Sequence, residues 1–190
     1  MYNAIKVSTK SMRLLFEGCS IEYILTECYG RCCESKNGIG VVILPREEEA
    51  ITRAGGMIND NLLQPNNKGI CPFKRDYLCS LHNKDIKPLA CILSPFAINS
   101  NNTLIIKNRN KLFRCFRDKR VATRPAYLAY KTTLVRLFGA VGTERLIKHL
   151  DSNRIEDIYM HVSADNYKDL LFVKDKHKSL RQKPVMEEAK

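Results

Sequence analysis

The sequence lacks several features that would place it in common protein classes. No stretch approaches the ~20 consecutive apolar residues of a transmembrane helix, so we expect no membrane-spanning segment. The beginning, MYNAIKVSTKSMR, has no unbroken apolar run of the secretory type, so we expect a cytoplasmic protein. Tryptophan is also absent, but 44% of the 190 residues are hydrophobic, which is enough to build a core and argues against a disordered chain.

The familiar motifs of several enzyme classes are missing as well. The chain contains no P-loop, GxGxxG, HExxH, nucleophile elbow or kinase signature, and no internal repeat. Whether the protein is an enzyme is therefore left open. A metal-dependent oxidoreductase or a protein-modifying enzyme is retained as an alternative.

Cysteine is plentiful but confined to one part of the chain. The last 75 residues contain none, and the eight thiols follow the spacing C-x8-C-x3-CC-x37-C-x7-C-x11-C-x23-C. In a reducing compartment such a set indicates metal ligands rather than disulfides. Thiolates suit zinc, copper(I) and iron, and they also hold iron in Fe–S clusters. The expected ligands are Cys28, Cys32, Cys33, Cys71, Cys79 and Cys91, with Cys115 and Cys19 as further candidates.

Some of these residues allow a second interpretation. Cys19 lies in a segment with the periodicity of an amphipathic helix, and Cys115 stands alone in a basic stretch, so each could be a small buried hydrophobe instead of a ligand. The adjacent Cys32 and Cys33 would point to opposite faces of a strand, so they can reach one metal together only from a loop or a helix start. Gly30, just before them, gives the backbone the freedom to turn there.

The order of motifs around the cysteines is distinctive. The segments are Cys28-Tyr29-Gly30-Arg31-Cys32-Cys33, Cys71-Pro72-Phe73, Cys79-Ser80-Leu81-His82, Lys87-Pro88-Leu89-Ala90-Cys91 and Ser94-Pro95-Phe96. Over about residues 19 to 115 this order closely resembles the zinc- or iron-chelating cysteine-cluster domain family, also called CxxCxxCC or YkgJ-like. The resemblance implies a metal-chelating module and names no reaction. Some flagellin lysine N-methylases contain a similar cluster, which is the analogy behind the protein-modifying alternative.

The chain departs from the family pattern at three places. Its first cysteines are spaced C-x3-CC rather than C-x2-C-x2-CC, Lys87 stands where the family usually has arginine, and Ile92 stands where it often has arginine after the cysteine. The residue that fills the outer ligand position is therefore open, and Cys19 is one candidate for it.

The periodicity predicts a helix-rich α+β fold. We expect an irregular cysteine-cluster metal domain over 1–120, a helical region over 121–178 packed on it, and a flexible tail over 179–190. The expected elements are a helix over 11–27, a strand over 39–44, a helix from Pro45 to Gly55-Gly56, a turn-rich loop over 59–70, a strand over 103–106, a helix from about Arg124 that breaks near Gly139 and Gly142, a helix starting at Thr143 and a helix from Asp165 or Asn166 through Leu171, after which the segment from His177 is expected to be loose.

Positive charge is concentrated near the last cysteine. Of the 32 Lys and Arg residues that give the formal charge of +12, eight lie within 107–124, where Asp118 is the acidic residue. Phe113 and Phe116 are interleaved with them, so the segment could bind a nucleic acid or other polyanion, or it could be a solvated face whose phenylalanines enter the core. The candidate contacts for a nucleic-acid-binding accessory protein with structural zinc are Lys111, Arg114, Arg117 and Arg120.

The remaining polar candidates have simpler explanations. His82, three residues after Cys79, is expected to pack beside a metal site rather than ligate it. His149, His161 and His177 are interpreted as ordinary surface or interface residues. The run Glu47–Glu49 is interpreted as the acidic first turn of a helix rather than as an acidic metal or catalytic site.

Overall fold

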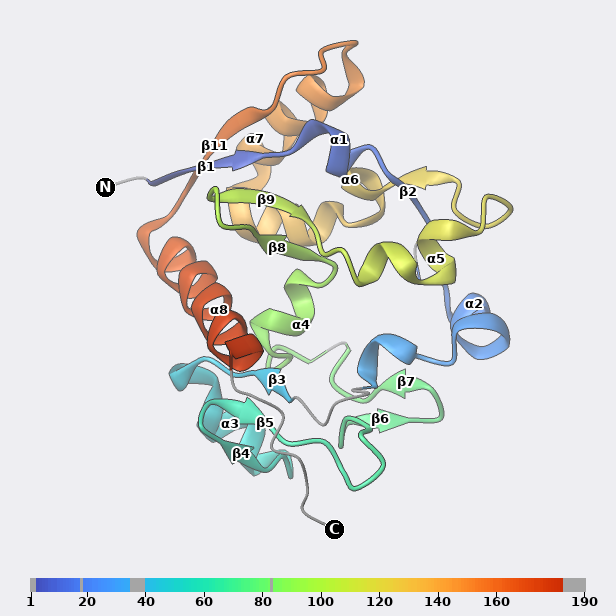
Figure 1. Cartoon of the computed structure of the whole chain (residues 1–190), viewed down its shortest axis with the longest axis vertical. Coiled ribbons are helices and arrows are strands. Elements are labelled where there is room, and N and C mark those ends of the chain that lie inside the picture. Colours follow the sequence, from blue (N-terminus) through green and yellow to red (C-terminus); the bar gives the residue numbers. More distant parts are fainter. Residues whose placement is uncertain (1–2, 18, 35–39, 83, 183–190) are drawn as a thin grey trace.

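A computed structural model describes residues 3–17, 19–34, 40–82 and 84–182 (Figure 1). The strands are β1 (Asn3–Val7), β2 (Leu15–Phe16), β3 (Val41–Val42), β4 (Ile58–Asn59), β5 (Leu62–Leu63), β6 (Lys74–Arg75), β7 (Leu78–Cys79), β8 (Phe96–Ile98), β9 (Thr103–Ile106), β10 (Arg124–Pro125) and β11 (Ile158–Val162). The α-helices are α1 (Thr9–Met12), α2 (Ile21–Tyr23), α3 (Glu48–Arg53), α4 (Leu89–Leu93), α5 (Arg114–Arg117), α6 (Ala126–Ala129), α7 (Lys131–Asp151) and α8 (Ala164–Gln182). The fold is mixed α+β and rich in helix, as predicted. No helix in the described part of the chain is long and apolar enough to span a membrane.

The largest sheet is built from both ends of the chain. Its order is β11-β1-β9-β8, with β1 antiparallel to β11 and parallel to β9. Ile5 and Val7 of β1 are fully buried, because alternate residues of a strand share one face. The sheet thus joins residues before and after position 120, the predicted boundary between the metal domain and the helical region.

Helix α7 covers this sheet and completes the larger hydrophobic core. The helical segment after Arg124 turns an apolar face to the core, since Tyr127, Leu134 and Leu137 are buried. The predicted break is also confirmed, because Gly139 leaves the helical conformation with φ 71°. Thr143 Oγ1 donates to the Gly139 carbonyl at 2.8 Å, and helix continues from there to Asp151.

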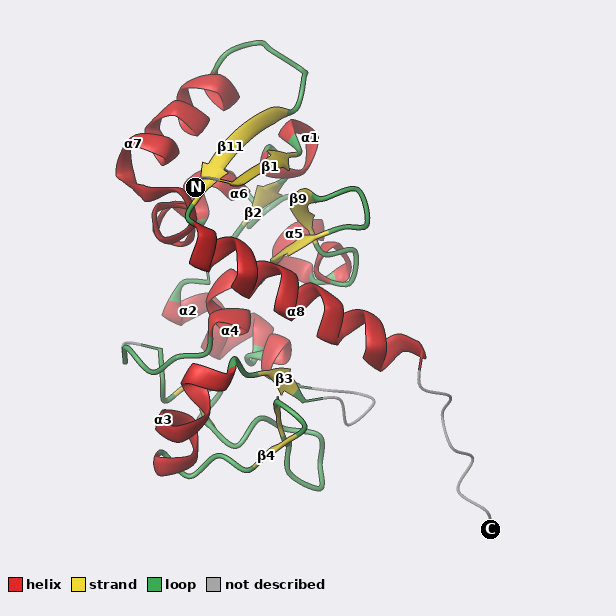
Figure 2. Cartoon of the chain, turned by 90° about the vertical axis from the view of Figure 1, so that its left-hand side faces the viewer, coloured by secondary structure: helices red, strands yellow, loops and turns green. Residues whose placement is uncertain are grey.

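A second, smaller core lies under the strands β3, β5 and β4. Its buried residues are Ile43, Ile51, Leu63, Phe73 and Leu81. Of the strand predicted over 39–44, the described residues 40–44 form a strand at Val41–Val42 alone (β3), and the predicted helix from Pro45 begins with a 3₁₀ turn (Pro45–Glu47) that leads into α3. Helix α8 contacts both β8 of the large sheet and β3 of the small one, and so connects the two parts of the fold (Figure 2).

The predicted helix over 11–27 is wrong. The segment instead forms α1, β2, α2 and a π-helical turn (Ile24–Cys28). Phe16 is the reason, because its ring packs against Phe116 at 4.6 Å and Tyr130 at 4.8 Å between ring centroids. These long-range contacts and the pairing of β2 with β10 override the local helical periodicity.

Two other predictions need correction. The loop expected over 59–70 contains β4 and β5, joined by a turn in which Asp60 and Asn61 have positive φ angles. Asn and Asp tolerate this conformation and favour tight hairpin turns. The segment expected to be loose from His177 onward continues α8 as far as Gln182, and residues 183–190 lie outside the described part.

Candidate metal centre

The adjacent cysteines Cys32 and Cys33 lie in a short 3₁₀ turn (Arg31–Cys33), not in a strand. The chain enters this turn through Gly30, whose φ is +61°, as its sequence position predicts. A Cβ atom at Gly30 would lie 2.3 Å from the Tyr77 carbonyl oxygen. Glycine is therefore required for the cysteine turn to approach the β6–β7 hairpin.

Backbone contacts join the two cysteine-rich stretches of the sequence. The Cys71 amide donates to the Cys33 carbonyl at 3.0 Å, and Glu34 forms an isolated bridge with Ile70. Lys74 Nζ pairs with Glu34 Oε1 at 2.5 Å. Cys33 and Cys71 are therefore held side by side although 37 residues separate them in the chain.

Cys91 lies in a helix whose first turn is hydrogen-bonded to the side chain of Glu47. It lies in α4, and the Leu89 amide at the start of this helix donates to Glu47 Oε1 at 2.8 Å. The other oxygen of Glu47 accepts from the Leu44 amide at 3.0 Å. The structure thus confirms the helix-start interpretation of Glu47 and shows that it also fixes α4.

The last cysteine lies close to the first ones. Cys115 in α5 is buried, and its carbonyl accepts from the Glu17 amide at 2.9 Å. Next to it, Arg114 pairs with Glu27 at 2.6 Å, and Glu27 precedes Cys28. Helix α5 is therefore fixed beside the π-helical turn that carries Cys28.

The electrostatic neighbours of each thiol divide the eight cysteines into two sets. Burial, followed by the nearby thiols of Cys19, Cys28 and Cys32, raises the pKa of Cys115 to about 12. These four form the first thiol group. The second thiol group consists of Cys33, Cys71, Cys79 and Cys91.

Within the second group, burial dominates the ionisation of Cys91. Its pKa rises to about 12 through burial, with a further contribution from the thiol of Cys71. Burial also raises the pKa of Cys71. Neutral thiols are therefore favoured here when no cation is bound.

The two groups meet at the Cys32–Cys33 pair. A hydrogen bond from the Cys33 thiol lowers the pKa of Cys32 to about 6 and raises that of Cys33. The positive charges of Lys87 and Arg109 also favour the Cys32 thiolate. The pair therefore favours the thiolate at Cys32 and the neutral thiol at Cys33.

All eight cysteines are free thiols. In the described ranges, however, no three His, Cys, Asp or Glu side chains converge closely enough to hold a metal ion. Thiolates are suitable ligands for zinc or iron, but in this structure the sulfur atoms of the described cysteines are too far apart for three of them to coordinate the same ion.

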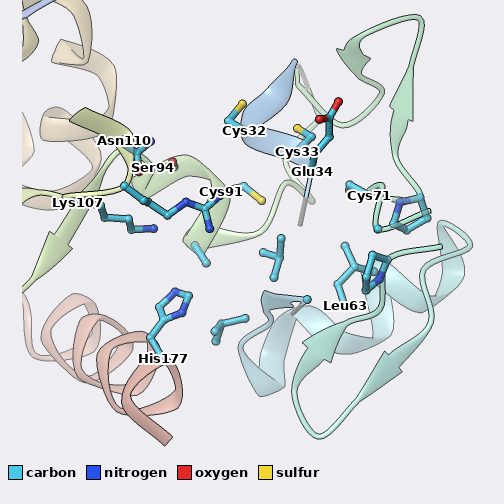
Figure 3. A pocket seen from close by; sticks show the side chains of 18 residues that line it. Cys32, Cys33, Glu34, Leu63, Cys71, Cys91, Ser94, Lys107, Asn110 and His177 are labelled. Atoms are coloured by element: carbon cyan, nitrogen blue, oxygen red, sulfur yellow. The ribbon is translucent and has the colours of Figure 1, made fainter. Parts of the chain in front are cut away.

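A cavity of about 110 Å³ lies at the centre of this region (Figure 3). Four of its lining residues are the cysteines Cys32, Cys33, Cys71 and Cys91. The opposite side is formed by residues from the turn after β9 and by His177 from α8.

The sequence interpretation missed His177 as a residue of this site. A helical pattern that places Leu170, Val173 and His177 on one face could have found it, since the first two are buried. Asn110, also in the cavity wall, is 6% exposed and gave no signal in the sequence.

The basic side chains around Cys115 differ in their partners and in their exposure. Arg114 pairs with Glu27, and Arg120 pairs with Asp118 at 2.7 Å. Lys111 donates to Asn108 Oδ1 at 3.3 Å, while Arg117 is exposed. Binding of nucleic acid by these residues stays a prediction.

The two phenylalanines of that segment face inward. Phe113 and Phe116 pack against the larger core, and the Phe116 ring contacts Phe16. These contacts favour the interpretation of the segment as a solvated basic face over that of a base-stacking surface.

His82 is exposed, with its Nδ1 3.2 Å from Lys87 Nζ. The charge of Lys87 lowers the pKa of His82. The packing of His82 beside a metal stays a prediction.

Fold and site together define a helix-rich α+β protein in which free thiols from separate segments surround a small cavity. Comparison of the chain with protein-family models, with curated proteins and with solved structures finds no match.

Proposed function

We propose that the protein binds a thiophilic metal, zinc or iron, through its cysteine thiolates. The observation that carries the proposal is that Cys33, Cys71 and Cys91, from three separate segments, all line one cavity. Soft thiolates select zinc or iron over hard cations such as magnesium. The resemblance to the zinc- or iron-chelating cysteine-cluster family supports the same assignment.

The weakness of the smaller core supports a structural role for the metal. This part of the fold has five residues in its buried cluster and strands of two residues each. So small a core supplies little stabilisation, and metal–thiolate bonds can add folding free energy. Because the side chains do not converge in the described structure, the proposal includes a rearrangement of thiols on metal binding.

The proposed ligands follow the two thiol groups. The second group, Cys33, Cys71, Cys79 and Cys91, is the stronger candidate because backbone contacts join its segments. The first group, Cys19, Cys28, Cys32 and Cys115, would complete a second site. A reducing setting such as the cytoplasm would keep all eight thiols available.

Metal analysis of anaerobically purified protein, with its visible spectrum, tests the proposal. We expect about one metal ion per chain or more, since a tetrahedral structural site uses four thiolates. Cobalt(II) added to the reduced metal-free protein should give the intense absorption of thiolate coordination. Less than about half a metal per chain, in a folded sample with free thiols and no cobalt spectrum, would contradict it.

Two single variants sharpen the assignment of ligands. Cys71→Ser should abolish stoichiometric binding at the second group. Ser80→Ala, in the same hairpin region, is the matched control and should bind as the natural sequence does. Equal metal content in both variants would remove Cys71 from the ligand set.

A further inference from the structure

The wall of the cavity that faces the thiols carries positive charge. Lys107 follows β9, and Arg109 comes two residues later. Figure 3 shows Lys107 and His177 on the side of the cavity away from Cys71, with Cys91 beside Lys107. Two cationic side chains from one turn and a histidine from α8 therefore line a space that cysteines also line.

Backbone hydrogen bonds fix the turn that presents these cations. The Lys107 amide donates to the Pro95 carbonyl at 2.9 Å, and the Asn110 amide donates to the Lys107 carbonyl at 3.0 Å. The Leu112 amide donates to the Arg109 carbonyl at 3.2 Å. The backbone positions of the cationic wall are thus set before any ligand arrives, which lowers the entropy cost of binding.

Asn110 in the same wall has an unused acceptor. Its side chain is almost fully buried, yet its Oδ1 makes no hydrogen bond. Buried polar atoms are satisfied in the great majority of proteins, so such an atom in a cavity wall points to a missing hydrogen-bond donor. A hydroxyl of an ion bound in the cavity would supply such a donor.

The acidic groups of the lining offset only part of the positive charge: the Cys32 thiolate, which Arg109 favours, can balance one of the two cations. Glu34 lines the cavity, but its carboxylate pairs with Lys74 Nζ at 2.5 Å, outside the cationic wall. The cavity, at about 110 Å³, is several times larger than one water requires and admits a small polyatomic ion.

We propose that the cavity binds a small protonated oxyanion, of the chemistry of hydrogen phosphate, between Lys107, Arg109 and Asn110. The guanidinium and ammonium groups supply charge-assisted hydrogen bonds to the anionic oxygens. The hydroxyl of the same ion donates to Asn110 Oδ1, which sulfate and carboxylate ions cannot do at neutral pH. This site requires no metal at the thiols and is therefore separate from the proposed function.

The ion is inorganic phosphate rather than a phosphate monoester, because a monoester is mostly a dianion without a hydroxyl at neutral pH. Calorimetric titration of the reduced, metal-free full chain, at neutral pH and constant ionic strength, uses inorganic phosphate, methyl phosphate and sulfate as probes. We expect saturation at one phosphate per chain. Methyl phosphate and sulfate should each bind at least about tenfold more weakly because they lack the donor, and equal binding of methyl phosphate would exclude the hydroxyl contact to Asn110.

Variants of the cationic wall complete the test. Lys107→Gln and Arg109→Gln should each weaken phosphate binding about tenfold or more. Lys119→Gln removes an exposed cation of the same basic segment and should leave binding unchanged. Asn110→Leu should reduce the preference for phosphate over sulfate. Since Asn110 is buried, circular dichroism checks that the Asn110→Leu variant folds. If it does not, phosphate binding by the Arg109→Gln variant decides, because Arg109 is exposed.

Two results would overturn the inference. One is the absence of saturable phosphate binding by the natural sequence. The other is an equal loss of affinity in Lys119→Gln and Arg109→Gln, which would mean diffuse attraction by the net charge. Phosphate binding without stoichiometric metal would contradict the proposed function alone, and metal binding without phosphate would contradict this inference alone.

Discussion

Cys32 and Cys33 are adjacent in the chain, yet the structure favours opposite ionisation of their thiols. The hydrogen bond from Cys33 lowers the pKa of Cys32 to about 6, while Cys91 across the cavity has a pKa raised to about 12 by burial. Cys32 is also exposed. Thiolate fraction and access together control thiol reactivity.

We predict that Cys32 is alkylated before Cys91 in the reduced, metal-free protein. A pH of 7 is above the pKa of Cys32, which is then mostly thiolate, and far below the pKa of Cys91. Iodoacetamide should therefore modify Cys32 at least about tenfold faster than Cys91. The rate at Cys32 should fall as the pH drops through about 6. Peptide mass spectrometry over time measures both rates, and equal rates at pH 7 would contradict the prediction.

A second prediction concerns Gly30, where the backbone conformation and a close contact act together. Gly30→Ala places a methyl group against the Tyr77 carbonyl oxygen at positive φ, so the turn must shift. We expect a loss of about 2–3 kcal/mol in the free energy of unfolding. Gly55→Ala is the matched control, because Gly55 also has positive φ but a Cβ there meets nothing within 4 Å.

The control variant should lose about 1 kcal/mol, the cost of the conformation alone. Urea unfolding measures both values. If the two variants lose the same amount, the approach of Gly30 to Tyr77 is not what requires glycine.

At the scale of elements, α8 is the piece that connects the two hydrophobic cores. Arg46, before α3, donates to both carboxylate oxygens of Asp169 in α8, at 2.6 and 2.5 Å. Asp169 is 8% exposed. The pair is bidentate and partly buried, so it stabilises the fold more than an exposed ion pair does.

We predict that Asp169→Asn lowers the free energy of unfolding by about 1–3 kcal/mol, because the Arg46 charge loses its partner. Glu49→Gln breaks the exposed pair of Glu49 with Arg53 and should cost less than about 0.5 kcal/mol. Urea midpoints of the two variants give the comparison. A smaller loss for Asp169→Asn than for Glu49→Gln would exclude a role for this contact in holding α8.

Local patterns predicted the elements whose stability is local. The acidic helix start at Glu47 and the break at Gly139 follow from chemistry within a few residues, and both are confirmed. The N-terminal strands could not be predicted in this way. Residues of β1 pair with β11 near the other end of the chain, and Phe16 is fixed by Phe116 and Tyr130.

The candidate site shows the same division. The cysteines of the cavity wall were predicted from their clustering, because thiols are rare and chemically distinct. His177 and Asn110 reach the cavity only through tertiary packing, so their residue types alone did not single them out. The two thiol groups likewise depend on contacts between distant segments, such as that of Cys115 with Cys28.

At the scale of the whole molecule, the two cores differ in what they need for stability. The larger core combines the four-stranded sheet with α7, and the smaller one has five buried residues in its cluster. We predict that stoichiometric zinc slows amide hydrogen exchange in residues 58–82 and leaves β1 nearly unchanged, because metal-bound thiolates would add stability to the smaller core.

Mass-spectrometric exchange with zinc and with excess chelator makes the measurement. The Cys71→Ser variant is the control, since it should show no zinc effect over residues 58–82. Slower exchange spread evenly over the chain would mean that zinc stabilises the molecule without a preference for the smaller core.

The central place of β1 in the large sheet has a consequence for biosynthesis. This strand leaves the ribosome first, but its antiparallel neighbour β11 is made only after residue 157, and its parallel neighbour β9 after residue 102. The sheet therefore cannot close until most of the chain has been translated, while the strands and thiols of residues 40–93 are already complete. Strand β1 therefore stays unpaired in the nascent chain while residues 40–93 can already fold, and an unpaired strand favours chaperone binding and misfolding.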